Sequence, residues 1–132
     1  MSGSIELIQA TYAAFGRGDV AAIQDMNSED TVWSVVGSSD YPLHRSFHGK
    51  SGIMEFFVAV AELEDFTELA PRSFHDAGDY VFVVGHAVYT LKTSNTAVDT
   101  DFVHVWGIKD GKVISFREFA DTAQVVAGLA AK

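Results

Sequence analysis

Four long runs rich in β-branched and aromatic residues fill the second half of the chain, and they limit the possible folds more than any other feature. The runs span residues 66–75, 80–92, 97–109 and 112–119. Asp110-Gly111 separates the last two runs and is a strong signal for a two-residue hairpin turn. Because turns this short join antiparallel neighbours, the runs predict a meander of antiparallel strands.

The first half of the chain favours helices. Apolar residues recur at spacings of three and four over residues 5–15, which is typical of an amphipathic helix, and Gly16 would end it. Asp19 is suited to cap a second helix that continues to Met26. Residues 53–60 are apolar around most of a helical circumference and predict a third, well-buried helix.

The remaining segments complete an α+β pattern. Residues 31–36 predict a short strand, and the glycine- and histidine-containing stretch 37–49 is typical of a long loop. Residues 122–129 predict a short terminal helix. Since the strands follow the helices without regular βαβ alternation, the expected fold class is α+β and not a doubly wound sheet.

Length, charge and composition restrict the partners. A chain of 132 residues fits one domain, covering residues 1–132, that can bury roughly two thirds of its unfolded surface. The formal charge of −9 repels nucleic acid and anionic membrane surfaces, so neither is an expected partner. No stretch approaches the roughly 20 apolar residues of a membrane span, and Met1 to Ile5 does not resemble a signal peptide. These features favour a cytoplasmic location. With no cysteine, thiol catalysis and cysteine-ligated zinc are excluded.

Short strings near both ends of the chain carry a family resemblance. They are YAAFGRGD at 12–19, DFVHVW at 101–106, DGKV at 110–113, FREF at 116–119 and Asp-Thr at 121–122. In residues and order they resemble the first helices and the last two strands of ketosteroid-isomerase-related and SnoaL-like members of the nuclear transport factor 2-like superfamily. The resemblance extends over nearly the whole chain.

The resemblance implies a fold and a range of functions. The fold would be a cone-shaped, curved antiparallel sheet packed against three N-terminal helices and enclosing a pocket, a cystatin-like arrangement, with a homodimer through the outer face of the sheet. Members of the superfamily include isomerases, polyketide cyclases, epoxide hydrolases, dehydratases and non-catalytic binding proteins. Function therefore has to be argued from individual residues.

His104 is the first candidate catalytic residue. Strand alternation places it on one face with Phe102 and Trp106, in apolar surroundings. The resemblance implies an oxyanion-stabilising acid near this position, and an imidazole there could donate a hydrogen bond to a carbonyl or shuttle a proton. The structural alternative is a histidine that is satisfied by a neighbouring strand or by water.

Glu118 is the second candidate, because it shares its expected strand face with Ile114 and Phe116. A carboxylate at the end of an apolar row can act as a general acid or base. The alternative is an ion pair with Arg117 or Arg72 at a sheet edge. The position resembles an essential acid of limonene epoxide hydrolases, but the Arg and Asp of that branch have no counterpart near residues 85–87, so epoxide hydrolysis is not expected.

Asp121 is the third candidate and resembles the acid of SnoaL-like polyketide cyclases. Its alternative role is to cap the helix that begins at Thr122. The general base of the ketosteroid isomerases would align near Ser34 and their catalytic tyrosine near Thr11, one residue from Tyr12. Steroid isomerase activity is therefore not expected, and a Tyr12 phenol in the pocket is a hypothesis whose alternative is core packing.

Aromatic residues are expected to form the pocket walls or simply the core. Besides Tyr12, the predicted ligand-binding residues are Trp33, Tyr41, Phe57, Tyr89 and Trp106. No metal site is expected, because His44 and His48 are four residues apart in a loop and that spacing does not place both rings on one face.

The sequence thus predicts a small-molecule enzyme that transfers a proton on an apolar carbonyl compound, in an isomerase- or cyclase-type reaction. His104, Glu118 and Asp121 are its candidate groups. Such chemistry needs oriented donors and acceptors in a dry cavity and requires neither a metal nor an organic cofactor. The alternative is a non-catalytic ligand-binding or interaction domain that uses the same cavity.

Overall fold

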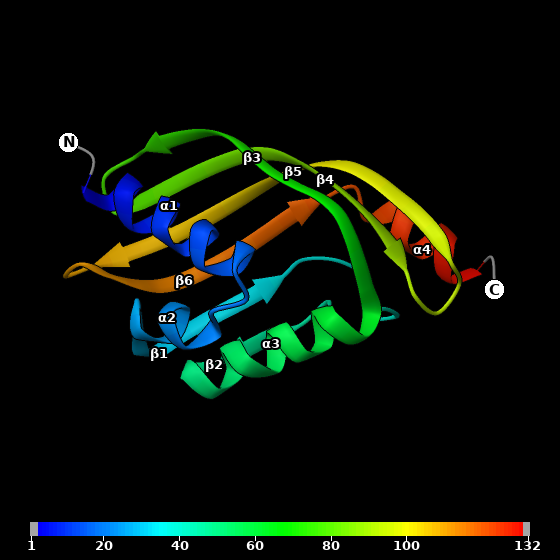
Figure 1. The fold of residues 1–132 in the computed structure, drawn as a ribbon, viewed down its shortest axis with the longest axis horizontal. Coiled ribbons are helices and arrows are strands. Elements are labelled where there is room, and N and C mark those ends of the chain that lie inside the picture. Colours follow the sequence, from blue (N-terminus) through cyan, green and yellow to red (C-terminus); the bar gives the residue numbers. More distant parts are fainter. Residues whose placement is uncertain (1–2, 131–132) are drawn as a thin grey trace.

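Across residues 3–130, the computed structural model contains four helices and one six-stranded sheet (Figure 1). The helices are α1 (Gly3–Gly16), α2 (Val20–Asp25), α3 (Gly49–Leu63) and α4 (Thr122–Ala130). The strands are β1 (Asn27–Val35), β2 (Ser46–His48), β3 (Glu64–Asp76), β4 (Tyr80–Leu91), β5 (Thr96–Lys109) and β6 (Lys112–Ala120). The first two residues of the Met1–Ile5 segment lie outside the described residues.

The sheet has the strand order β2-β1-β6-β5-β4-β3. Strands β3 to β6 form the antiparallel meander that the sequence predicts. Strand β1, however, pairs in parallel with β6, so the sheet is mixed and the expectation of a purely antiparallel sheet was wrong in this detail. The reason is topological, because β6 returns to the free edge of β1 after the whole meander. The α+β fold class is confirmed.

The hairpin between β5 and β6 turns at the predicted Asp110-Gly111 pair. Both residues have positive φ, 54° for Asp110 and 75° for Gly111, as this type of tight turn requires. Beyond the turn the register shifts, since Gly107 pairs with Ser115 but Ile108 pairs with Val113.

This shift is a bulge that leaves Ile114 as the additional residue on β6. Ile114 is 36% exposed, whereas Phe116 is 3% exposed. The expectation that Ile114, Phe116 and Glu118 share one face was therefore wrong for Ile114, because the alternation is reset between it and the residues that follow.

Strand β1 begins four residues earlier than the predicted strand, at the buried side chain of Asn27. The Asn27 Oδ1 atom accepts hydrogen bonds from Thr31 Oγ1 and Trp33 Nε1, both at 2.9 Å, and its Nδ2 donates to the Ile23 carbonyl at 2.8 Å. The polar stretch that follows α2 therefore enters the fold, because both the oxygen and the nitrogen of the buried Asn27 amide have hydrogen-bond partners. Strand β2 also forms within the predicted loop 37–49.

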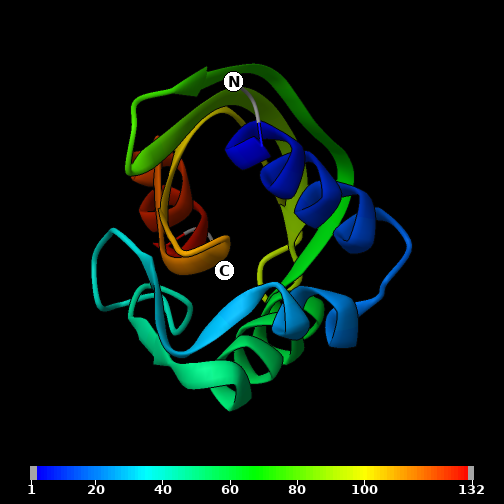
Figure 2. The same cartoon turned by 90° about the vertical axis from the view of Figure 1, so that its left-hand side faces the viewer.

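The sheet is strongly curved, and helices fill its concave side. Figure 2 shows β3 to β6 curving around α1, with α2 and α3 on the opposite side of the interior. Asp19 caps α2 as predicted, since its side chain accepts a hydrogen bond from the Ala22 N–H at 3.1 Å. The core between these layers includes Ile8, Ala14, Trp33, Ile53, Phe56, Val81, Val83, Phe102, Trp106 and Phe116.

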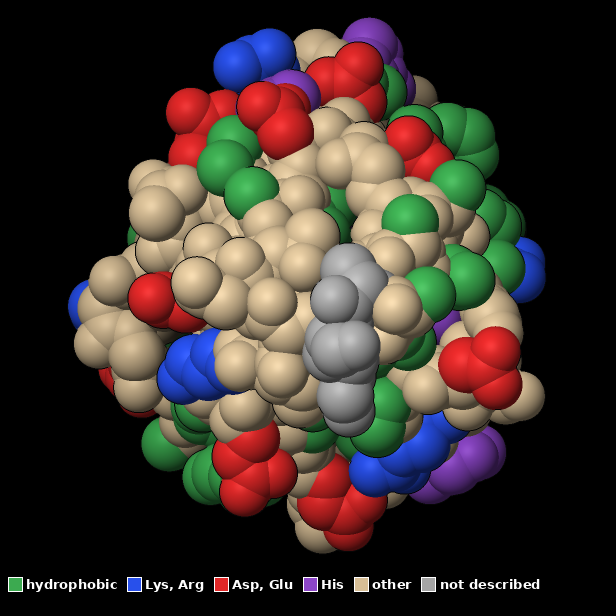
Figure 3. All heavy atoms as spheres, turned by 90° about the vertical axis from the view of Figure 1, so that its right-hand side faces the viewer, with side chains coloured by type: hydrophobic (Ala, Val, Ile, Leu, Met, Phe, Trp, Pro, Cys, Tyr) green, Lys and Arg blue, Asp and Glu red, His purple; other side chains and the backbone are tan. Residues whose placement is uncertain are grey.

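The outer surface is divided between apolar and charged regions. On the convex face of the sheet, Tyr80, Phe82, Val84 and Val103 are each more than a third exposed. At the end of the molecule that carries α4, acidic side chains are spread around the face and are not gathered in one patch (Figure 3). Within the described part of the chain, no helix has the length and apolar character needed to cross a membrane.

Candidate functional site

A cavity with a free interior of about 60 Å³ lies between the concave face of the sheet and the helices. Its walls are mainly apolar and are formed by Phe15, Ile23, Trp33, Leu43, Phe56, Phe57, Val60, Phe66, Leu69, Trp106 and Phe116. Its polar lining residues are Thr11, Tyr12, Glu64, His104 and Glu118. An apolar enclosure with a few directing polar groups is the usual form of a small-molecule site.

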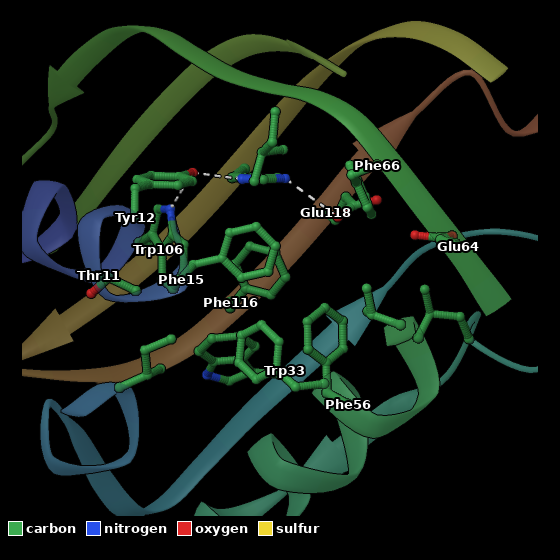
Figure 4. A pocket seen from close by; sticks show the side chains of 16 residues that line it. Thr11, Tyr12, Phe15, Trp33, Phe56, Glu64, Phe66, Trp106, Phe116 and Glu118 are labelled. Atoms are coloured by element: carbon green, nitrogen blue, oxygen red, sulfur yellow. Dashed lines mark hydrogen bonds and ion pairs between the residues drawn. The ribbon is translucent and has the colours of Figure 1, made fainter. Parts of the chain in front are cut away.

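A chain of polar contacts, two hydrogen bonds and one histidine–carboxylate pair, crosses one wall of this cavity (Figure 4). Trp106 Nε1 donates to the Tyr12 hydroxyl oxygen at 3.1 Å, and that hydroxyl lies 2.6 Å from His104 Nδ1. On the other side of the imidazole, His104 Nε2 lies 3.3 Å from Glu118 Oε1. Residues from α1, β5 and β6 thus form one connected polar group in an apolar environment.

The donors and acceptors determine where the protons lie. The indole N–H of Trp106 can only donate, so the Tyr12 oxygen accepts from it. When the imidazole is the Nε2–H tautomer, Tyr12 gives its own proton to His104 Nδ1. In this arrangement the remaining imidazole proton is on Nε2 and points to the Glu118 carboxylate, which satisfies all the groups of the chain.

Local structure explains why these side chains meet. His104 and Glu118 are cross-strand partners in the β5–β6 ladder, so their side chains project from the same face at neighbouring positions. Phe102 stacks against the imidazole with ring centroids 4.0 Å apart and interplanar angle 20°. His104 is only 4% exposed, so its ring is held between aromatic neighbours and its polar partners.

Burial keeps Tyr12 in its phenol form. Burial is the main cause that raises the pKa of Tyr12 above its ordinary value of 10, the hydrogen bond from Trp106 lowers it, and the charge of Glu118 raises it. The hydroxyl therefore keeps its proton over the whole physiological pH range.

A second polar pair lies at the other end of the cavity. The Tyr41 hydroxyl donates to Glu64 Oε2 at 2.8 Å, and both residues are buried. Burial raises the pKa of Glu64 from 4.5 to about 8, the hydrogen bond from Tyr41 lowers it, and the charge of Glu118 raises it. Glu64 therefore holds a proton at neutral pH for much of the time.

Sequence reasoning did not single out Glu64. The structure places this residue where α3 passes directly into β3, a junction at which neither helical nor strand periodicity applies. Leu43, Phe56 and Phe116 were also missing from the predicted lining. The only available signal for Glu64 was an acidic residue next to a long apolar strand, and that signal is weak.

Six of the predicted site residues line the cavity: Tyr12, Trp33, Phe57, His104, Trp106 and Glu118. Tyr41 and Tyr89 are buried but do not belong to the lining. Tyr41 instead holds Glu64, and Tyr89 packs on Phe66 with ring centroids 4.9 Å apart.

Asp121 lies outside the cavity lining and is exposed. Its Oδ1 accepts a hydrogen bond from the Ala123 N–H at 3.2 Å, and its Oδ2 accepts one from Gln124 Nε2 at 3.0 Å. The carboxylate thus caps the start of α4, the alternative role expected from the sequence. The predicted catalytic role of Asp121 has no support in this geometry.

The curved sheet, the helices within it and the enclosed cavity define the class of nuclear transport factor 2-like α+β proteins. Within this class, the model of the SnoaL-like domain matches residues 8–116. The chain belongs to the SnoaL-like family.

Solved structures support this assignment over nearly the full length. A nuclear transport factor 2-like protein from Burkholderia xenovorans LB400 is 26% identical, with a TM-score of 0.88 over 97% of this chain and 96% of that one. TerC, co-crystallized with polyporic acid, is 31% identical with a TM-score of 0.83, over 98% and 99% of the two chains. A protein from Mesorhizobium loti, provisionally assigned as a SnoaL-like polyketide cyclase, shares the fold at 18% identity, with a TM-score of 0.72 over 87% and 97%. No curated protein matches the chain.

Proposed function

We propose that this protein is a small-molecule enzyme that transfers a proton on an apolar carbonyl compound, in an isomerase- or cyclase-type reaction. The observation that supports this most directly is the chain of polar contacts from Tyr12 through His104 to Glu118 along an apolar cavity wall. A histidine with only a structural role would not need a carboxylate partner that also lines the cavity.

Glu118 is the proposed general base. In an enolisation, the C–H bond next to the carbonyl breaks, the proton passes to a Glu118 carboxylate oxygen, and the electron pair of that bond forms the enolate. His104 orients the carboxylate through its Nε2–H, and Tyr12 fixes the imidazole tautomer. The apolar walls reduce the contact of this carboxylate with bulk water, since its side chain is 28% exposed.

Deuterium exchange tests this proposal. We expect the protein to accelerate exchange of the α-protons of 2-tetralone in D₂O, followed by proton NMR, and the Glu118→Gln variant to lower that rate by about 10²-fold or more. Glu68→Gln is the matched control, because Glu68 is exposed on β3 and pairs only with Arg72 at 3.7 Å.

The same experiment separates the enzyme from a non-catalytic binding protein. Saturable binding of 2-tetralone without any exchange above the buffer rate would contradict the catalytic proposal and favour a binding domain. TerC, a similar protein, was co-crystallized with polyporic acid, so this compound is a suitable second probe for the cavity.

A homodimer through the convex sheet face is part of the proposal. The exposed apolar side chains of β4 and β5, among them Phe82, Val84 and Val103, support it, since exposed apolar clusters of this kind often mark protein interfaces. A cytoplasmic location stays a prediction.

A further inference from the structure

Glu64 is a second carboxyl group of the cavity, and the proposed proton transfer from carbon to Glu118 does not use it. It lies at the first residue of β3 and is 8% exposed. Of all the ion pairs formed by residues 3–130, none includes Glu64. A charged carboxylate that is buried without a cation lowers the stability of the protein. Such a group therefore carries a proton or is retained for a function.

Tyr41 holds this carboxyl group in place but occupies only one of its two oxygens. The Tyr41 hydroxyl donates to Oε2 at 2.8 Å, and the other oxygen has no hydrogen-bond partner within the described part of the chain. Figure 4 shows the Glu64 carboxyl pointing from β3 toward the cavity and toward Glu118. One oxygen is thus anchored and the other is available to a ligand.

The groups that face Glu64 act in opposite directions, since the charge of Glu118 favours its neutral form and the hydrogen bond from Tyr41 favours its charged form. They are Tyr41 from the loop before β2, Tyr89 from β4 and Glu118 from β6, which are neutral or negative. Lys92 follows Leu91, the β4 partner of Glu64, but its Nζ donates to the Ala61 carbonyl at 2.6 Å. Burial and the charge of Glu118 together raise the pKa of Glu64 to about 8.

We propose that Glu64 is the acid of this site, and that its protonated carboxyl donates a hydrogen bond to the carbonyl oxygen of the substrate while Glu118 removes a proton from the adjacent carbon. The inference rests on the proposed function, which it deepens. Two carboxyl groups in one cavity, one paired with a histidine and one without a cation, are suited to opposite roles in acid–base catalysis.

The step is balanced. The C–H bond breaks and its proton goes to the Glu118 carboxylate, while the electron pair forms the new C=C bond. The carbonyl π pair moves to oxygen, which takes the proton of Glu64 and becomes the enol hydroxyl. Glu64 is then the carboxylate and Glu118 the acid, and the reverse transfers on ketonisation restore both groups.

The proposed roles specify a class of substrate. The two carboxyl groups serve a carbonyl oxygen and the carbon next to it, so the substrate is an enolisable ketone. Aromatic walls and the small interior favour a flat compound, and the uncompensated acidic groups disfavour one that carries its own carboxylate near Glu64.

Ligand binding tests the inference without requiring turnover. Trp33 and Trp106 are the two tryptophans of the chain and both line the cavity, so their fluorescence reports binding directly. The affinities of 2-tetralone and of tetralin, its analogue without the carbonyl, are measured from pH 6 to 9.5. We expect the preference of the protein for the ketone to fall by about tenfold as pH rises through the region near 8.

Two variants assign the effect to Glu64. Glu64→Gln keeps an amide donor, so we expect it to keep the ketone preference at every pH but to lose about 10²-fold in the exchange rate of bound 2-tetralone. Glu64→Leu should bind ketone and hydrocarbon with the same affinity, and Glu68→Gln should behave as the unmodified protein. Glu64→Gln thus separates binding from proton transfer.

The outcomes distinguish this inference from the proposed function. A ketone preference that is unchanged by pH, or that persists in Glu64→Leu, overturns the role of Glu64 even if exchange occurs. Absence of exchange together with the expected pH-dependent preference overturns the enzyme proposal and the proton-transfer role, but leaves Glu64 as a ligand-binding group. Failure of 2-tetralone to bind at all overturns both.

Discussion

At the scale of single residues, the site depends on the number of protons that each group can give. Trp106 gives one to Tyr12, Tyr12 gives one to His104, and His104 gives one to Glu118, so each member of the chain orients the next. When one member of such a chain is removed, its neighbours on both sides lose a partner but remain buried in an apolar environment. The loss is therefore larger than that of one hydrogen bond.

Replacing Tyr12 by Phe should therefore affect stability and activity together. The change removes the acceptor of Trp106 and the donor to His104, and we expect a loss of about 1–3 kcal/mol in the free energy of unfolding. The exchange rate of 2-tetralone should fall and its pH profile should change, because the tautomer of His104 is no longer fixed. Urea denaturation and NMR measure the two effects. Tyr80→Phe, an exposed tyrosine on the sheet, should change neither.

Glu64 gives a second prediction at this scale, on the pH dependence of stability. Its folded pKa of about 8 lies above the ordinary value of 4.5, so the unfolded chain releases the proton first. The stability of the protein relative to Glu64→Gln should be greatest below about pH 4.5 and should fall, by roughly 3–5 kcal/mol in total, as pH rises to 8. Denaturation of both proteins at several pH values measures this, and a constant difference would contradict it.

At the scale of elements, the β4–β5–β6 ladder sets the position of the site. Gly85 on β4 pairs with Phe102 on β5, whose ring in turn stacks on His104. A Cβ atom at position 85 would lie 2.5 Å from the Ala70 carbonyl oxygen on β3 and would also overlap the Phe102 ring. The close approach of these strands thus requires a glycine.

Gly85→Ala should consequently destabilise the protein by about 1–3 kcal/mol and reduce exchange activity. The reason is that the β3 backbone at Ala70 or the Phe102 ring must shift. Gly16→Ala is the matched control, since a Cβ there meets no atom within 4 Å. Thermal denaturation and the exchange assay compare the two variants. Equal stability of the two variants would contradict this prediction, because it would show that β3 and β4 can move apart at Gly85 without a loss of stability.

At the scale of the whole molecule, the curved sheet produces two different surfaces from the same strands. The concave face, with the helices, encloses the cavity, and the convex face carries exposed apolar side chains bordered by His86, Asp99 and Asp101. If the convex face forms the proposed dimer, the two sites open away from the interface and act independently.

The dimer proposal is tested by changing this surface alone. We expect the protein to sediment as a dimer at micromolar concentration, and the double variant Phe82→Lys, Val84→Lys to sediment as a monomer, because charges would be buried in the interface. Met54→Lys, at an exposed apolar position on α3, should remain dimeric. A monomeric unmodified protein would contradict the proposal.

The sequence by itself determined the order and type of most elements. Spacings of three and four in the first helix, the Asp19 cap and the Asp110-Gly111 turn are local signals, and each acts within a few residues of its position. Strand alternation also placed His104 correctly on the buried face, because β5 is regular at that point.

Tertiary structure decided the features that depend on residues distant in the chain. The parallel pairing of β1 with β6, the satisfied amide of Asn27 and the bulge at Ile114 all arise from contacts that no local pattern records. The same is true of the Tyr41–Glu64 pair, since its partners come from a loop and from a helix–strand junction. Local periodicity determines which face a side chain occupies, but only the packing of separate elements determines which side chains meet and how their protons are shared.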